Sequence, residues 1–76
     1  MEMNDFIKNF STLFDDCLPE SLSQETEFRN IEGWSSITAL SVLAMIDEEY
    51  DVSLKGNDII NSITIDDLFK IVKSKS

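Results

Sequence analysis

Several chemically important residue types are absent or scarce in this chain of 76 residues. Histidine is absent and Cys17 is the only cysteine, which excludes zinc sites, disulfides and histidine-based catalysis within the chain. We expect Cys17 to be a small buried or half-buried thiol rather than a redox centre. No apolar run is long enough to span a bilayer, and the N-terminus lacks the basic start and apolar stretch of a signal peptide. We therefore expect a cytoplasmic protein without a metal site.

Basic residues are also scarce, with six against fifteen acidic residues and a net charge of −9. Nucleic acids and anionic membrane surfaces need clustered Lys and Arg, so we expect neither as a partner. Basic protein partners, attracted by electrostatic steering, suit this charge better. The acidity is equally consistent with a surface that only keeps a small protein soluble, and the composition leaves both interpretations open.

Apolar residues make up 42% of the chain, too many for a disordered tail. The length allows one core, so we predict a single domain over residues 1–76. Apolar spacings of three and four predict main helices from Asn4 to about Asp16, from Ser36 to Tyr50 and from Ile65 to Lys73, and a turn near Asn57 to Ile60 forms a short fourth helix. No strand-like alternation persists, so the predicted class is all-α.

Local signals mark where these helices begin and end. Asn4 is the expected N-terminal cap of the first helix, and Pro19 follows its end. Thr64 and Asp67 resemble a capping box for the last helix, with Asp in place of the usual Glu. The long connection over residues 21–33 is polar. Its three apolar residues are expected to pin it to the core: Leu22, Phe28 and Ile31.

The second predicted helix has two distinct faces at about 100° per residue. Its core face is expected to carry Ala39, Val42, Leu43, Ile46 and Tyr50. Its opposite face, the predicted docking face, carries Ile37, Leu40, Ser41, Ala44, Asp47 and Glu48. Exposed apolar residues beside an acidic rim favour docking of a partner that presents Arg or Lys around an apolar pocket. Alternatively, the long loop or the short helix covers Ile37 and Leu40.

The start of this helix, Gly33-Trp34-Ser35-Ser36-Ile37, places serine hydroxyls where unpaired backbone N–H groups and the positive end of the helix dipole favour an anionic phosphate. A serine in this position is either an ordinary helix cap or the attachment point of a phosphate-linked group. Trp34 is expected to plug the core and fix the entering loop. The alternative is that it lines a groove for a bound chain.

With these motifs in order, the chain resembles the acyl carrier protein family, including the peptidyl carriers. The family shares a small acidic four-helix bundle with a long first loop, and a modified serine in an Asp-Ser-Leu motif starts its second helix. The matching motif here is Ser35-Ser36-Ile37, and the acidic segment that ends in an aromatic residue is Ile46-Asp47-Glu48-Glu49-Tyr50. Tyr50 lies fourteen residues after Ser36, which sets the register on Ser36. The likeness covers nearly the whole chain.

The resemblance implies a freestanding carrier that holds acyl intermediates as thioesters on a covalent 4′-phosphopantetheine arm, derived from coenzyme A and attached to Ser36. Ser35, Trp34 and Ile37 would flank the attachment. The implied pathway is fatty acid or specialised lipid or polyketide biosynthesis. The implied partners are a phosphopantetheinyl transferase and acyl-loading and acyl-using enzymes with basic docking patches, and the carrier itself would be a monomer. The residues suggested to line a site for the acyl chain are Leu43, Ile46, Ile63 and Leu68. The alternative is that these four residues only pack in the core.

Two departures from the family pattern stand out. Ser35 replaces the usual acidic residue before the modified serine, although it can still cap the helix. Thr38, Leu40 and Ser41 stand where typical fatty-acid carriers are more acidic, which suggests a dedicated partner set. The competing hypothesis is an unmodified helical adaptor that binds a partner through the second helix. We do not expect an enzyme, because the sequence shows no set of acid, base and nucleophile.

Overall fold

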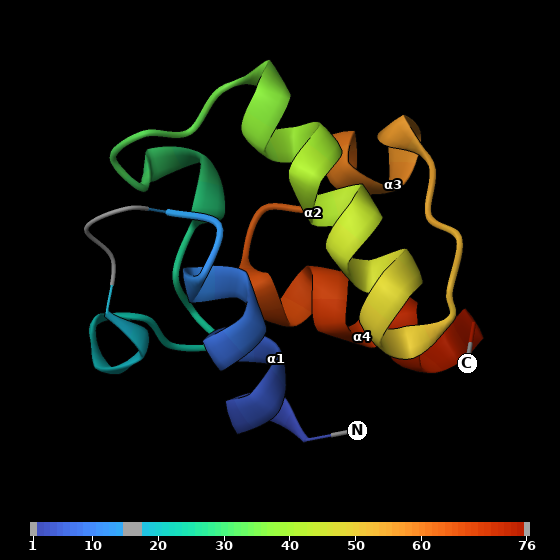
Figure 1. Ribbon diagram of the computed structural model, residues 1–76, viewed down its shortest axis with the longest axis horizontal. Helices are drawn as coiled ribbons and strands as arrows, with labels where there is room; N and C mark the ends of the chain where they lie inside the picture. The colour runs from blue at the N-terminus through green and yellow to red at the C-terminus, as the bar shows by residue number, and fades with distance from the viewer. Residues whose placement is uncertain (1, 15–17, 76) are drawn as a thin grey trace.

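Four α-helices make up most of the computed structural model, which describes residues 2–14 and 18–75. They are α1 (Met3–Ser11), α2 (Ser36–Tyr50), α3 (Gly56–Ile60) and α4 (Ile65–Lys75) (Figure 1). Two 3₁₀ turns, η1 (Pro19–Ser21) and η2 (Phe28–Asn30), lie in the connection between α1 and α2. The described residues contain no β-strand, only an isolated antiparallel bridge between Glu27 and Thr64. The predicted all-α bundle with one short helix and a long first loop is confirmed.

The first helix differs from its prediction at both ends. It begins at Met3 with Glu2, not Asn4, as its cap, because Glu2 is extended and its carbonyl accepts the Phe6 N–H at 3.1 Å. It ends at Ser11 rather than near Asp16, since the next amides bond three residues back and tighten the chain into a turn. The apolar residues at helical spacing from which this helix was predicted, Phe6, Ile7, Phe10, Leu13 and Phe14, all face the core. The Cys17 prediction lies outside the described residues.

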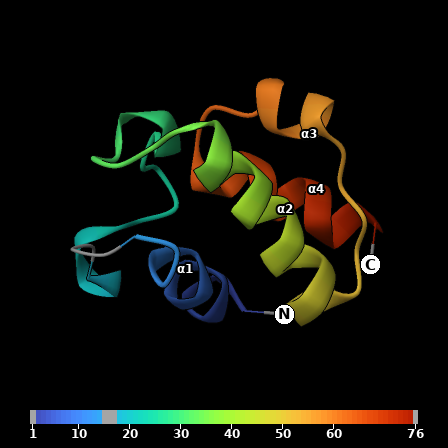
Figure 2. The same ribbon diagram turned by 45° about the horizontal axis from the view of Figure 1, so that its top comes forward.

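One core is shared by α1, α2, α4 and the long loop. In the second view α2 lies between α1 and α3 and contacts both (Figure 2). Aromatic rings join the elements, with Phe6 and Phe69 5.5 Å apart and Phe10 and Phe28 6.2 Å apart between ring centroids. The core side chains without exposed surface are Phe6, Phe10, Phe28, Val42, Ile46, Ile65, Leu68 and Val72.

The long loop is pinned to this core as predicted. Phe28 is fully buried, and Leu22 and Ile31 are half-buried against the core. The loop backbone also completes α4, because the carbonyls of Thr26 and Gln24 accept the first amides of that helix at 3.0 and 2.9 Å. Those amides have no partner inside the helix, so the loop satisfies groups that would otherwise be left unpaired.

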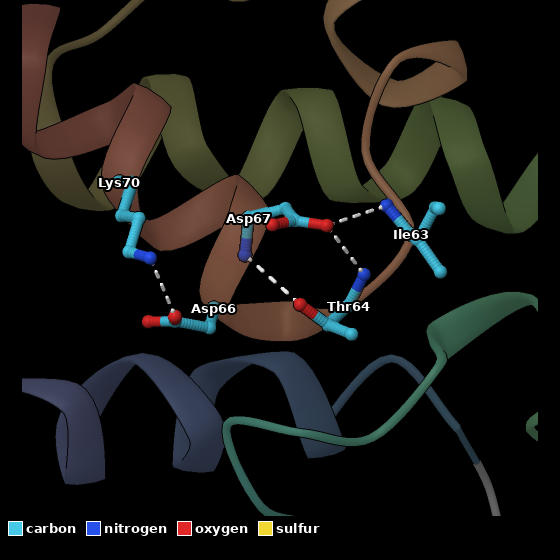
Figure 3. A network of polar contacts seen from close by, with 5 residues as sticks. All are labelled: Ile63, Thr64, Asp66, Asp67 and Lys70. Atoms are coloured by element: carbon cyan, nitrogen blue, oxygen red, sulfur yellow. Dashed lines mark hydrogen bonds and ion pairs between the residues drawn. The ribbon is translucent and has the colours of Figure 1, made fainter.

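The predicted capping box at the start of α4 is confirmed (Figure 3). The Asp67 carboxylate accepts the backbone N–H groups of Ile63 and Thr64 at 3.0 and 3.1 Å, and the Thr64 hydroxyl accepts the Asp67 N–H at 3.2 Å. These bonds to the charged form hold the pKa of the Asp67 carboxyl below its usual value, the bond from Ile63 contributing most. Asp66 pairs with Lys70 one turn on, at 3.1 Å.

The remaining boundaries follow the predictions closely. Helix α2 spans the predicted Ser36 to Tyr50, α3 begins one residue earlier than predicted, and α4 continues two residues further, to Lys75. Over residues 2–14 and 18–75, no helix has the length and apolar character needed to cross a lipid bilayer.

Candidate functional site at the start of helix α2

The chain enters α2 through a turn that only glycine adopts without strain. Gly33 has φ of +97°, in the region that L side chains avoid, and the Trp34 N–H donates to the Ile31 carbonyl at 3.1 Å. The half-buried Trp34 ring lies 5.0 Å from Phe28 and 6.4 Å from Phe14, measured between centroids. Trp34 therefore packs against the core and anchors the residues that precede the helix.

Ser35 is the N-cap of α2. Its backbone is extended, its carbonyl accepts the Ala39 N–H at 3.0 Å, and its hydroxyl accepts the Thr38 N–H at 3.3 Å. The Thr38 hydroxyl lies 3.2 Å from the Ser35 hydroxyl and donates to the Gly33 carbonyl at 3.1 Å. This polar group fixes the turn on the helix and uses one of the amides that a helix start leaves unpaired.

Ser36 is the first residue of the helix, and its side chain is exposed. No described residue donates to or accepts from its hydroxyl, because Ser35 has taken the capping role. The first turn of α2 carries no acidic residue, so its positive dipole end is not neutralised locally. A hydroxyl here is accessible to an enzyme, and a phosphodiester on it would lie at the favourable end of the helix dipole.

The predicted docking face of α2 is open. Ile37 is 76% exposed and Leu40 is 65% exposed, so neither the long loop nor α3 covers them. Ala44, Asp47 and Glu48 are exposed as well, whereas Ser41 is half-buried and donates to the Ile37 carbonyl at 3.1 Å. An exposed apolar pair of this size beside carboxylates is the kind of surface that partners cover.

The inward face also follows the prediction, with one residue missed. Val42 and Ile46 are fully buried, and Ala39, Leu43 and Tyr50 are half-buried. Met45, which the helical angle placed on neither face, is only 7% exposed. The Tyr50 hydroxyl accepts a hydrogen bond from Asn9 Nδ2 at 3.0 Å and ties the end of α2 to α1. Burial raises the pKa of the Tyr50 phenol.

The four residues suggested as an acyl-chain lining do not form one buried set. Ile46 and Leu68 have no exposed surface and Leu43 is half-buried, but Ile63 is 56% exposed. Tight core packing accounts for Ile46 and Leu68. The structure instead has a shallow open hollow of about 330 Å³ over the long loop, which the sequence did not indicate. It is lined by Ser21, Leu22, Thr26, Glu27, Asn30 and Ile31.

The far end of α2 is strongly acidic. Its last turn holds no basic residue. The side chains of Asp47, Glu48 and Glu49 are exposed. Asp51 ends the helix in the left-handed conformation at φ 55°. The negative end of the helix dipole repels these carboxylates, so their interaction with the helix is unfavourable in the isolated chain. Among the described residues, no group of three or more His, Cys, Asp or Glu side chains could hold a metal ion.

Sequence reasoning missed the role of Arg29. Its guanidinium donates to the carbonyls of Ile59 and Ile60 at 2.6 and 3.0 Å, some thirty residues away. The only available signal was that Arg29 is the sole basic residue between Lys8 and Lys55.

No model of a known protein family matches this chain, and no curated protein is similar to it at a significant level.

Proposed function

We propose that this chain is an acyl carrier protein that holds acyl intermediates as thioesters on a 4′-phosphopantetheine arm at Ser36. One observation carries the proposal: Ser35 caps α2, so the Ser36 hydroxyl stands exposed at the first helical position without a described partner. A serine that only capped the helix would have its hydroxyl occupied. The order and spacing of the family-like motifs over nearly the whole chain support the same function.

The protein's part in this function is position and recognition, while the arm supplies the thiol. Attachment joins Ser36 Oγ to the phosphorus of the pantetheine phosphate of coenzyme A. The oxygen leaving that phosphorus departs with adenosine 3′,5′-bisphosphate, and the transferase accepts the serine proton. The carrier would act as a cytoplasmic monomer in fatty acid or specialised lipid or polyketide biosynthesis.

The docking face of α2 would receive the transferase and the acyl-loading and acyl-using enzymes. Ile37 and Leu40 offer apolar area close to Ser36, and Asp47 and Glu48 offer charge further along the same helix. A complementary partner presents an apolar pocket with Arg or Lys on the side that meets the acidic end. The first three turns of the docking face carry no charge, so apolar fit governs contact next to Ser36.

The experiment is intact-protein mass spectrometry after incubation with coenzyme A and a broad-specificity phosphopantetheinyl transferase. Wild type should gain one phosphopantetheine, Ser36→Ala none, and Ser35→Ala, the matched control, one at a slower rate. Transferases from the native host extend the test, because Ser35 stands where the family has an acidic residue. Lack of any gain with all of these enzymes would refute the carrier function.

A second function is an unmodified helical adaptor that binds a partner through α2. The 76% and 65% exposed side chains of Ile37 and Leu40 favour it, because they form an open apolar surface whether or not Ser36 is modified. Ser36→Ala separates the two functions. An adaptor would bind its partner as before, whereas a carrier would lose its function completely.

A further inference from the structure

Two adjacent serines lie at the start of α2, and exposure does not distinguish them. The side chains of Ser35 and Ser36 are both exposed, and the first turn of the helix carries no acidic residue. An enzyme that approaches this end of α2 therefore meets two serine hydroxyls. The two differ in their hydrogen bonds, because Ser35 is bonded to Thr38 and Ser36 is bonded to no described residue.

The donors and acceptors around Thr38 follow from the groups involved. The Thr38 hydroxyl lies 3.1 Å from the Gly33 carbonyl oxygen, which can only accept, so the single hydroxyl proton of Thr38 is donated to Gly33. The Ser35 hydroxyl lies 3.2 Å from the same Thr38 oxygen. Because Thr38 has no second hydroxyl proton, Ser35 must be the donor of this bond.

The Ser35 hydroxyl is therefore engaged both as a donor and as an acceptor. Its proton is donated to Thr38 Oγ1, and its oxygen accepts the Thr38 N–H at 3.3 Å. The series of bonds continues to the carbonyl of Gly33, whose φ of +97° sets the turn before the helix. The Trp34 ring, 5.0 Å from the Phe28 ring between centroids, anchors the same turn to the core. These contacts hold the Ser35 hydroxyl against the first turn of α2.

Transfer of phosphopantetheine requires a serine whose proton is accessible to the enzyme. The serine oxygen forms a bond to the pantetheine phosphorus, the bond from that phosphorus to the leaving oxygen breaks as adenosine 3′,5′-bisphosphate departs, and the serine proton passes to a base of the transferase. The base must lie within hydrogen-bond distance of that proton. The Ser35 proton points to Thr38 instead, whereas no described residue engages the Ser36 hydroxyl.

We propose that Thr38 is a specificity-determining residue, which engages the Ser35 hydroxyl and thereby directs modification to Ser36. This inference rests on the proposed carrier function. It gives a physical reason for the choice between two adjacent hydroxyls that does not depend on the likeness to carrier proteins. Thr38 acts only through Ser35 and the turn at Gly33, the groups with which its hydroxyl forms hydrogen bonds.

The experiment asks whether loss of the Thr38 hydroxyl makes Ser35 a substrate. Wild type, Ser36→Ala and the double variant Ser36→Ala/Thr38→Val are incubated with coenzyme A and a broad-specificity phosphopantetheinyl transferase. Intact mass gives the number of groups added, and fragmentation of the tryptic peptide 30–55, which contains both serines, gives their position. Ser36→Ala should gain none. The double variant should gain one phosphopantetheine on Ser35, because valine keeps the shape and N–H of Thr38 but leaves the Ser35 proton without its acceptor. Alanine in place of that valine should give the same result.

Two controls separate the Thr38 hydroxyl from a general loosening of the fold. Ser36→Ala/Thr38→Ser keeps a hydroxyl at this position and should remain unmodified. Ser36→Ala/Ser74→Ala removes a different exposed hydroxyl, which donates to the Ile71 carbonyl at 2.8 Å in α4, and should also remain unmodified. Thermal unfolding followed by circular dichroism establishes that each variant is folded.

Three results would overturn the inference. If Ser36→Ala/Thr38→Val and its alanine counterpart stayed unmodified while wild type was modified on Ser36, Thr38 would have no part in the choice, and the carrier function would stand. If Ser35 were modified in every Ser36→Ala variant, its hydroxyl would be accessible with Thr38 in place. A wild-type chain that is never modified would refute the carrier function, and the role of Thr38 with it.

Discussion

The pair Ser35 and Ser36 separates the two roles that a serine can have at the start of a helix. Ser35→Ala removes the cap and leaves the exposed Ser36 hydroxyl in place. Ser36→Ala removes that hydroxyl and leaves the cap. We expect the first substitution to lower stability and the second to abolish modification. Of these two adjacent serines, one should therefore affect mainly the stability of the fold and the other only its modification.

The size of the stability effect follows from the cap geometry. An Ala at a helix N-cap costs about 0.5–2 kcal/mol. The bond from the Thr38 N–H to Ser35 Oγ is 3.3 Å long and exposed, longer than the usual distance of about 2.9–3.0 Å, so the lower half of that range applies. A loss of about 0.5–1 kcal/mol corresponds to a Tm lower by about 2–8 °C in a domain of this size.

Ser36→Ala should change stability little. The Ser36 side chain is exposed and bonded to no described residue, and substitutions at such positions stay within about 0.5 kcal/mol. Thermal unfolding followed by circular dichroism at neutral pH gives Tm for both variants, and intact mass after transferase treatment gives the modified fraction.

Two results would refute the assignment of the two serines. If Ser36→Ala lowered Tm by several degrees and Ser35→Ala did not, Ser36 would be the cap. If Ser35→Ala abolished modification while Ser36→Ala was still modified, the attachment site would be Ser35. Thr38→Val is a further test of the cap, because it keeps the N–H that Ser35 accepts and removes the Thr38 hydroxyl, which bonds to the Gly33 carbonyl and lies 3.2 Å from the Ser35 hydroxyl.

Three further outcomes are expected. Asp51→Gly should raise the free energy of unfolding in urea by about 0.5–1 kcal/mol, since glycine adopts the left-handed backbone of Asp51 without strain. Asp51→Asn is the control that shows how much of this increase comes from removing the charge. The pKa of the Asp67 carboxyl is lowered in the fold, so its carboxylate stabilises the fold above the unfolded-state pKa and loses this effect as pH falls through the folded-state pKa. The free energy of unfolding of Asp67→Asn, measured from pH 7 to 2, should therefore lack the part of the decline at acidic pH that Asp67 causes in wild type. The same dependence on pH in both proteins would contradict this. Reversing the charges of Asp47 and Glu48 should slow association with the transferase and flatten its salt dependence in stopped-flow measurements, whereas unchanged on-rates at all ionic strengths would refute electrostatic steering.

The elements that the sequence predicted correctly depend on interactions over about four residues. The bounds of α2 follow from its apolar spacing and from Ser35 as a cap, and the Thr64–Asp67 box formed as predicted. The same spacing correctly divided α2 into a buried and an exposed face, because a helix turns by a fixed angle per residue. Met45 was missed because it lies at the border of the two faces, where only the neighbouring helices decide burial.

Contacts between distant segments decided the rest. The first helix stops at Ser11 although apolar residues continue at helical spacing, because Leu13 and Phe14 reach the core from a turn just as well. Whether the loop or α3 covered Ile37 and Leu40 could not be read from periodicity, which gives the direction of a side chain but not its neighbours. Arg29 reaches carbonyls thirty residues away, and the loop carbonyls of Gln24 and Thr26 cap α4. The sequence by itself determined the bounds of α2, its two faces and the capping box of α4, since these follow from local backbone geometry. Only the tertiary structure decided which faces stay open and how α3 is held, because those depend on segments brought together by folding.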